Sequence, residues 1–481
     1  MAINRGLISS IELSERPLGP VVLVVAGAGL ALAAGLLLTG MGPTGAVSLP
    51  LAIGVVSLAL WSPYWALVVT LAQFAFVPSE GTLFGYFVPN VLQLLAPVVL
   101  GAALLRALKE ADHERLAPRL TDFLVVGFGL WGLVGLFVSQ YGAVWKWYGN
   151  RMLLPMMLYF AVRLLPISRK QVRTLIFILL AAIAIQSLLM FRESMAGSSP
   201  LYEVQSGLVQ GVKPAKGPFP FKWNAATYLT LWPSLFIYAI ASSHDRRKKA
   251  LWGIGLFAVL AAAGRTMERS SIAASLIAIV FCLLSGKLRR TTLIVMLALA
   301  FAYIPWSMGQ AGSGLLERFR QTDQSRYAYR TAAINLLKSD RWDPIFGIGW
   351  HRFRAVAGHF GTEEQVVAWG SRQGTVAEIA RGSALHNVWL AIPVEFGGVG
   401  VLLALGLLVG LIRGIVAIRR FALAGARVDE GLVVSMLGSL IALAAVGYYQ
   451  NVYSMVASMS VLWVFYGLLA VSPRAFFESE V

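Results

Sequence analysis

Long apolar runs alternate with short polar connections along almost the whole chain. A helix that crosses the hydrocarbon core of a bilayer needs about 20 predominantly apolar residues. Runs near this length occur at 18–39, 47–61, 63–77, 89–106, 121–139, 151–165, 171–191, 223–242, 249–264, 270–285, 291–308, 386–412, 431–449 and 452–470. Some neighbouring runs are short or closely spaced, so the pattern predicts an all-α, polytopic integral membrane protein with 12–14 transmembrane helices.

The composition agrees with this prediction. Hydrophobic residues occupy 58% of the 481 positions, charged residues occupy 13%, and the mean hydropathy is +0.71. Soluble domains carry about 25% charged residues, so this chain cannot cover itself with a polar surface. The one cysteine, Cys282, lies in an apolar run, which excludes a disulfide framework and a cysteine-based metal site. Residues 1–17 are largely polar and the first apolar run is long, so we expect no cleaved signal peptide.

The net charge of +17 reflects topology rather than nucleic-acid binding. The basic clusters are Arg106/Lys109/Arg115/Arg119, Arg163/Arg169/Lys170/Arg173, Arg246/Arg247/Lys248/Lys249, Lys287/Arg289/Arg290 and Arg413/Arg419/Arg420/Arg427. Threading 14 spans from a cytoplasmic N-terminus places every cluster in a cytoplasmic loop. This distribution follows the positive-inside rule, and it predicts that both termini are cytoplasmic and that no nucleic acid is bound.

The same threading divides the chain into membrane and loop regions. These regions are a cytoplasmic segment 1–17, transmembrane helices 18–308 with an outer loop near 192–222, a large outer loop 309–385, transmembrane helices 386–472 and a cytoplasmic tail 473–481. Loops as long as 309–385 are usually functional or disordered. Its aromatic residues favour folding against the membrane face. No internal repeat typical of transporters is evident.

Arg265 and Arg269 are the first candidate ligands for an anion. Residues four apart share a face of a helix, and this pair lies at the outer end of the span that begins near 270. A helix N-terminus attracts anions, and two guanidinium groups can hold a diphosphate bidentately. The alternative is that both arginines extend to lipid headgroups, with Glu268 pairing one of them.

Two outer segments carry further candidates. Lys216 lies in a proline-rich stretch before the span at 223, where Asn224 could cap the following helix. A rigid loop with an interfacial tryptophan is the alternative interpretation. In the large loop, the pattern predicts a short amphipathic helix over 326–338, which begins with Arg326 and ends in a Pro/Gly turn. Taken alone, such a helix commonly packs on the membrane surface.

His386 and Asn387 open the span at 386–412. Near neutral pH an imidazole can accept a proton from a hydroxyl group or orient it, and the threading puts His386 on the same face as Arg265, Arg269 and Lys216. A cap or interfacial role is the alternative. Glu395 lies nine residues later, about 13 Å deeper at the 1.5 Å rise of a helix. A carboxylate at that depth needs a partner or a function, and pairing with a buried basic residue would make it structural.

The chain lacks two motifs of nucleotide-dependent enzymes. It has no Asp-x-Asp of the type that holds a divalent metal on a nucleotide sugar. It also has no glycine-rich phosphate loop or dinucleotide fingerprint on the cytoplasmic side. We therefore expect no metal and no cofactor, and a donor that already carries its leaving group.

Four motifs between about 205 and 405 together resemble the O-antigen ligase and O-antigen polymerase superfamily. They are His386-Asn387 followed by Glu395 and a glycine cluster, Arg269-Ser270-Ser271, Lys216-Gly-x-Phe followed by Asn224, and the Arg326 helix followed by Pro344-x-x-Gly-x-Gly349. The chain departs from the family pattern in having Lys216 where arginine is common and Glu268 where serine is common.

The resemblance implies an all-helical class C glycosyltransferase in the bacterial inner membrane, with a glycan on undecaprenyl diphosphate as donor on the periplasmic face. It implies that Arg265, Arg269 and Lys216 bind the diphosphate and that His386 activates or positions the acceptor hydroxyl. Arg326, Asn387 and Asn224 would position the glycan or acceptor. The acceptor could be lipid A–core, a second lipid-linked repeat or a protein hydroxyl. A transporter of an anion or small solute is the alternative class.

Overall fold

The computed structural model is mostly helical. It describes residues 54, 56–76, 82–83, 86–87, 91–139, 148–196, 214–219, 221–308, 324–350, 352–360, 385–450, 452 and 455–477. The predicted segment 1–17 and the span 18–39 lie outside these residues, as do much of the span 47–61, large parts of the loops 192–222 and 309–385, and residues 478–481 of the tail.

A helix lies in every predicted apolar run from 63–77 to the last one. The main helices are α3 (Pro63–Ala72), α4 (Val91–Lys109), α5 (His113–Leu116), α6 (Leu120–Ser139), α8 (Leu154–Leu164), α9 (Arg169–Ala196), α10 (Lys222–Leu229), α11 (Pro233–Ser242), α12 (Arg246–Arg265), α13 (Arg269–Phe281), α14 (Gly286–Met308), α16 (Gln324–Leu337), α17 (Phe353–Val356), α20 (Val388–Leu423), α21 (Glu430–Gly447) and α22 (Val456–Val471). Two short strands, β1 (Thr82–Leu83) and β2 (Tyr86–Phe87), pair antiparallel.

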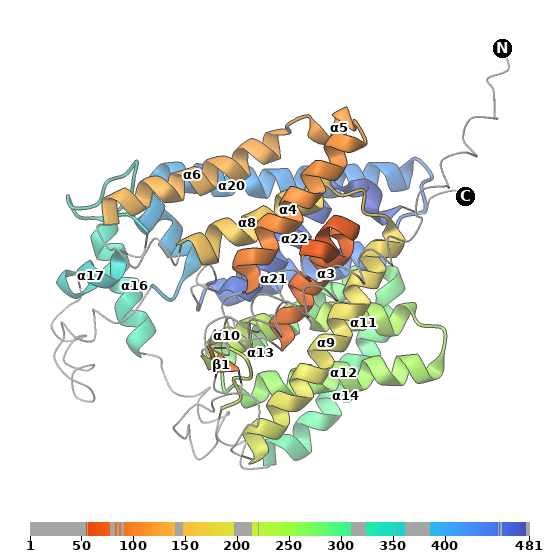
Figure 1. The fold of residues 1–481 in the computed structure, drawn as a ribbon. Coiled ribbons are helices and arrows are strands. Elements are labelled where there is room, and N and C mark those ends of the chain that lie inside the picture. The colour runs from red at the N-terminus through yellow and green to blue at the C-terminus, as the bar shows by residue number, and fades with distance from the viewer. Residues whose placement is uncertain are drawn as a thin grey trace, which may run out of the picture.

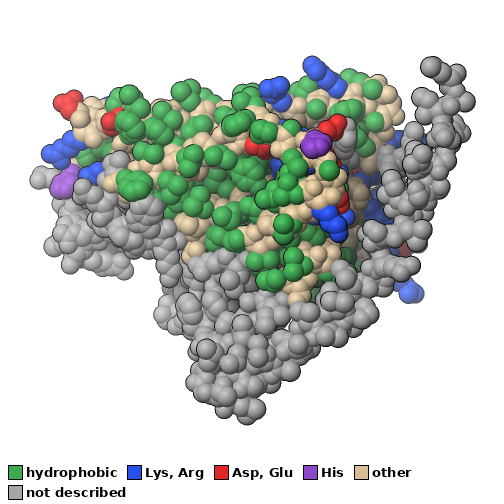
Figure 2. Space-filling model, turned by 45° about the horizontal axis from the view of Figure 1, so that its top comes forward, with side chains coloured by type: hydrophobic (Ala, Val, Ile, Leu, Met, Phe, Trp, Pro, Cys, Tyr) green, Lys and Arg blue, Asp and Glu red, His purple; other side chains and the backbone are tan. Residues whose placement is uncertain are grey.

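Five of the described helices are long and apolar enough to cross a membrane. They are His113–Phe137, Arg169–Ala196, Lys222–Ser242, Val388–Leu423 and Glu430–Gly447. Pro63–Ala75, Arg269–Leu284 and Val456–Val471 are apolar but shorter. Figure 2 shows a broad hydrophobic surface with Lys and Arg side chains gathered near its margins. The described part of the chain is therefore consistent with an all-α membrane protein.

The helices pack around α22. All of its residues except Leu462 and Ala470 are buried, as expected of a helix that is apolar on every side. It contacts α8, α20 and α21. Figure 1 shows α6 and α20 side by side along one edge of the bundle, and α9 and α12 side by side away from that edge.

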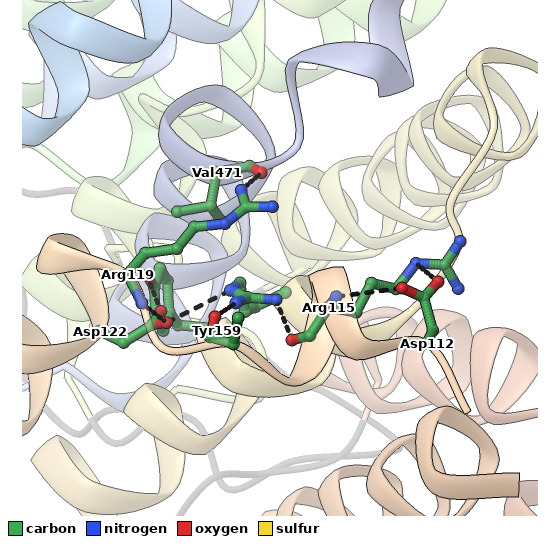
Figure 3. Close-up of polar contacts among 8 residues, drawn as sticks. Asp112, Arg115, Arg119, Asp122, Tyr159 and Val471 are labelled. Atoms are coloured by element: carbon green, nitrogen blue, oxygen red, sulfur yellow. Dashed lines mark hydrogen bonds and ion pairs between the residues drawn. The ribbon is translucent and has the colours of Figure 1, made fainter. Parts of the chain in front are cut away.

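A polar cluster around Asp122 joins α6 to α8 on the side with the predicted cytoplasmic loops (Figure 3). The Asp122 carboxylate accepts a hydrogen bond from the Tyr159 hydroxyl at 2.7 Å and pairs with Arg163 at 3.3 Å. The guanidinium of Arg163 also donates to the carbonyl oxygens of Arg115 and Ala117. These bonds satisfy a buried charge and hold the connection between α5 and α6 against α8.

The long helix α20 is broken near its N-terminal end. Pro393 lies inside it, and Gly397 has φ +64° and ψ −164°, which is outside the helical region. A break of this kind leaves carbonyl and N–H groups without their helical partners.

The segment 342–349 supplies the missing partners. Its hydrogen bonds to α20 run from Ile348 N to Val394 O (3.0 Å), from Gly349 N to Glu395 O (3.1 Å), from Trp342 Nε1 to Pro393 O (3.2 Å) and from Gly398 N to Pro344 O (2.7 Å). Trp131 of α6 donates to Phe396 O at 2.8 Å. The Pro/Gly turn predicted after the 326–338 helix is thus part of the helix bundle.

The close approach of Gly347 to Gly397 gives the first prediction. Gly347 has φ +69°, and a Cβ atom there would lie 2.6 Å from Gly397 N and 2.7 Å from Val394 O. Gly347→Ala should therefore destabilise the fold by the strain of a positive φ, about 1–3 kcal/mol, together with the backbone clash. The thermal unfolding midpoint in detergent measures the loss.

Gly253→Ala in α12 is the matched control, because a Cβ atom at Gly253 meets nothing within 4 Å. It should leave the midpoint unchanged or raise it slightly. Equal unfolding midpoints for both variants would contradict the conclusion that the 342–349 segment stabilises α20.

Candidate functional site

Except for Glu395, the predicted site residues lie at or near helix ends on the side that the threading assigns to the outside. These ends belong to α10, α12, α13, α16 and α20, and Lys216 lies in the loop before α10. In Figure 1, α10, α13 and α16 lie away from α5.

Arg265 and Arg269 do not share one helix, so the prediction of a common helix face is wrong. Arg265 is the last residue of α12 and Arg269 the first residue of α13. Between them the chain turns through Met267, which has φ +59°. Thr266 supports the turn because its hydroxyl donates to Ala263 O at 2.6 Å and accepts from Glu268 N at 3.3 Å. Arg269 therefore begins a new helix and lies at its N-terminus.

The Arg265 side chain joins α12 to the outer end of α9. Its Nε donates to Ser194 Oγ at 2.9 Å, and its Nη2 donates to Ser194 O at 3.3 Å. The Arg265 backbone carbonyl also accepts from Ala215 N at 3.0 Å. Arg265 thus joins α12 to α9 and to the loop 214–219, whereas Arg269 lies at the start of α13.

Lys216 lies in a loop that is anchored on both sides. Next to it, Ala215 bonds to the Arg265 carbonyl, and Gly217 N donates to Glu193 Oε2 of α9 at 3.2 Å. Gly217 has φ +54°, and a Cβ atom there would lie 2.7 Å from Met190 Cγ. These contacts hold the half-buried Lys216 beside the end of α12.

Asn224 does not cap the following helix, so that prediction is wrong. α10 begins at Lys222 and its N-cap position is Phe221, so Asn224 lies inside the helix. The predicted helix start was too late, because α10 begins at Lys222, before the first residue of the apolar run. Among the described residues, none donates a hydrogen bond to the buried Asn224 Oδ1.

Lys222 is a site residue that the sequence did not single out. Its ammonium group lies 3.3 Å from Glu268 Oε1, and both side chains are only 10% exposed. Glu268 also accepts from Gln450 Nε2 at 3.5 Å. The pair Lys222–Glu268 therefore connects α10, the turn before α13 and the residues after α21. Glu268, which departs from the family pattern, was the only available signal for such a partner.

α16 covers the start of α20. Its bounds, Gln324–Leu337, confirm the helix predicted over 326–338. The ring centroids of Tyr329 and His386 are 6.0 Å apart, and the Arg330 guanidinium lies 4.5 Å from the ring centre of Tyr448. Arg326 belongs to this helix, but its side chain lies outside the described residues.

His386 and Asn387 open α20 as predicted. Asn387 is the N-cap, and its Oδ1 accepts from Leu390 N at 3.2 Å. This bond occupies the side-chain oxygen, so the structural role of Asn387 is capping. His386 directly precedes it and is partly exposed.

Glu395 lies apart from His386, close to the break in α20. Its side chain is fully buried, and its backbone carbonyl accepts the hydrogen bond from Gly349. It therefore belongs to the region where the 342–349 segment meets α20.

The outer end of α21 links the two halves of the site. Tyr448 contacts Arg330 of α16, and the next residue of that helix towards its start, Tyr329, contacts His386. Gln450 contacts Glu268, which directly precedes Arg269. Segments far apart in sequence thus meet at one end of the bundle, with Glu268 and Arg269 on one side of residues 448–450 and Arg330 and His386 on the other.

The Lys222–Glu268 pair gives the second prediction. Removing one member of a buried ion pair costs about 3–5 kcal/mol, because the other charge stays buried. Lys222→Met alone and Glu268→Gln alone should each lower the thermal unfolding midpoint, and the double variant should recover part of the loss. Strictly additive losses would show that the two side chains do not interact.

Comparison of the sequence with protein family models finds no match, and comparison with curated proteins finds none either. The choice of function therefore depends on the residues of the site and their arrangement.

Proposed function

We propose that this protein is an inverting glycosyltransferase of the bacterial inner membrane. In this proposal it transfers or polymerises a glycan from an undecaprenyl diphosphate carrier on the periplasmic face, without metal or nucleotide. The supporting observation is the meeting of Lys216, Arg265 and Arg269 at the same end of the bundle as His386. The acceptor is lipid A–core for a ligase or a second lipid-linked repeat for a polymerase.

The charge of the site suits a diphosphate. The loop 214–219, the end of α9, the start of α10 and the α12–α13 turn hold five cationic residues and two carboxylates, namely Arg192, Lys216, Lys222, Arg265, Arg269, Glu193 and Glu268. The formal surplus is three positive charges, which favours an anion such as a diphosphate diester. Because Lys222 and Glu268 pair with each other, the surplus falls on Arg192 and on the residues that the motifs indicated.

The proposed reaction needs one proton acceptor and one anion-binding group. The acceptor hydroxyl attacks the anomeric carbon, its proton passes to His386, and the bond from that carbon to the diphosphate oxygen breaks. The leaving diphosphate gains negative charge, which Arg269, Lys216 and Arg265 stabilise electrostatically. In-line attack inverts the anomeric configuration.

The alternative of an anion or solute transporter also has an observation in its favour. Transporters often bind their substrates where a membrane helix is broken, and α20 is broken at Gly397 near the buried Glu395. However, the backbone groups freed at this break are bonded to the 342–349 segment. This bonding favours a structural role for the break.

The third prediction concerns His386. His386→Ala should lower glycan transfer by about 10²–10⁴-fold, the usual contribution of a general base, without changing the unfolding midpoint. The assay uses purified protein in lipid with an undecaprenyl-diphosphate-linked glycan and each acceptor. A ladder of longer glycans indicates a polymerase, and a single addition to lipid A–core indicates a ligase.

His359→Ala is the matched control, since His359 is an exposed histidine of the loop 309–385 that precedes His386. It should keep wild-type transfer. Undiminished transfer by a well-folded His386→Ala protein would remove His386 from the mechanism. Anion uptake into liposomes without any transfer would instead support the transporter.

The fourth prediction concerns Arg269. Arg269→Gln should lower kcat/KM for the lipid-linked donor by about 10²–10³-fold, as for loss of one group that stabilises developing charge. Arg269→Lys should recover only part, because lysine lacks the planar fork of arginine. Arg246→Gln, at the opposite end of α12, is the control. Equal activity of Arg269→Gln and Arg246→Gln would contradict a role for Arg269 in donor binding.

A further inference from the structure

A second charged cluster lies at the opposite end of the bundle, around Asp429. This residue is the N-cap of α21, and its side chain is fully buried. Its Oδ2 lies 2.7 Å from the Tyr238 hydroxyl, 3.1 Å from Arg169 Nη2 and 3.8 Å from Arg173 Nε. Its Oδ1 lies 3.6 Å from Lys287 Nζ. One carboxylate thus forms ion pairs with three cations.

The cluster lies at a corner formed by four helices. Arg169 and Arg173 belong to the first turns of α9, Lys287 to the first turn of α14, and Tyr238 to the second half of α11. The Asp429 backbone N–H also donates to Phe476 O at 3.0 Å, which ties the chain after α22 to the same corner. The threading assigns this corner to the cytoplasmic boundary of the membrane.

The carboxylate neutralises only one of the three cations. Burial raises the pKa of Asp429, but the hydrogen bond from Tyr238 and the charges of Lys287 and Arg169 more than offset this effect, so the pKa lies below its usual value. Asp429 is therefore ionised at neutral pH, and the cluster keeps a formal surplus of two positive charges. Cations held this close repel one another, and a further anion would reduce that repulsion.

The surplus charge is accessible from outside the bundle. The exposed fraction of the side chain rises from 14% for Arg169 to 34% for Arg173 and 47% for Lys287. Arg169 is the most buried of the three cations and lies closest to Asp429, whereas Arg173 and Lys287 lie farther from the carboxylate and expose more of their side chains to a ligand.

The face of α14 that continues from Lys287 towards the C-terminus of the helix is apolar and exposed. Ile294, Leu297 and Phe301 lie 7, 10 and 14 residues after Lys287, on the same face of α14, and they are 59%, 59% and 68% exposed. A stripe of this kind runs from the cationic corner along the membrane-facing side of the helix. A lipid matches both parts, because its phosphate is anionic and its acyl chain is apolar.

We infer that Arg173 and Lys287, supported by Arg169 and Asp429, bind the phosphate headgroup of an anionic lipid of the cytoplasmic leaflet. Guanidinium groups bind phosphate through paired hydrogen bonds, and basic pockets between transmembrane helices on the cytoplasmic side are suited to anionic headgroups. The acyl chain lies along the exposed face of α14. This inference is independent of the proposed transferase activity.

The experiment measures lipid retention by the full chain. Protein purified in detergent is mixed with phosphatidylglycerol or phosphatidylcholine, and bound lipid is counted by native mass spectrometry. We expect wild-type protein to retain phosphatidylglycerol in preference to phosphatidylcholine. The double variant Arg173→Gln/Lys287→Gln should weaken the apparent affinity for phosphatidylglycerol at least tenfold. Arg246→Gln/Lys248→Gln, which removes two exposed cations at the start of α12, should leave it unchanged.

Two further measurements distinguish loss of lipid binding from a folding defect, and a lipid headgroup from a soluble phosphate compound. Arg173→Lys keeps the charge at the same corner, so it should retain more lipid than Arg173→Gln, which a purely structural defect would not predict. Inorganic phosphate at millimolar concentration should not displace the lipid. Complete displacement would assign the corner to a soluble phosphate compound, and equal lipid retention by the double variant and the control would overturn the site altogether.

Discussion

The arrangement of the half of the protein that holds His386 depends on hydrogen bonds to the backbone groups at the break in α20. No water is available in the hydrocarbon core to replace a lost helical hydrogen bond, so a broken helix there needs partners from the protein. The 342–349 segment and Trp131 provide them to the carbonyl groups of residues 393–396. This segment follows α16, and its attachment therefore fixes α16 over the start of α20 and beside His386.

α21 is held at both of its ends by polar contacts. At its N-terminal end, Asp429 connects it to α9, α11 and α14. At its C-terminal end, Tyr448 and Gln450 connect it to α16 and to the α12–α13 turn. Between them, Ser439 contacts the Ser234 hydroxyl of α11 at 3.1 Å. The candidate site and the Asp429 cluster are thus both attached to α21.

The helices were predictable from the sequence because length and apolarity suffice to indicate a membrane helix. The amphipathic helix over 326–338 and the helix start at Asn387 were also predictable, since both have local signals. The break between Arg265 and Arg269 was not. It depends on a positive φ at Met267, a residue that gives no sign of a turn. The contacts of Lys222 with Glu268 and of Gly347 with Gly397 join residues about 50 positions apart, so only tertiary packing establishes them.

The break in α20 also constrains the order in which the chain can assemble in the membrane. Residues 342–349 are synthesised before α20, and in the predicted topology they have already crossed the bilayer when α20 arrives. The outer half of α20 cannot remain in hydrocarbon with bare carbonyl groups, so its insertion is completed only when the exported segment folds back onto it. In the predicted topology, export of the loop and insertion of α20 are therefore one coupled step of biogenesis. The helices α21 and α22 follow α20, whose final position depends on the exported segment 342–349.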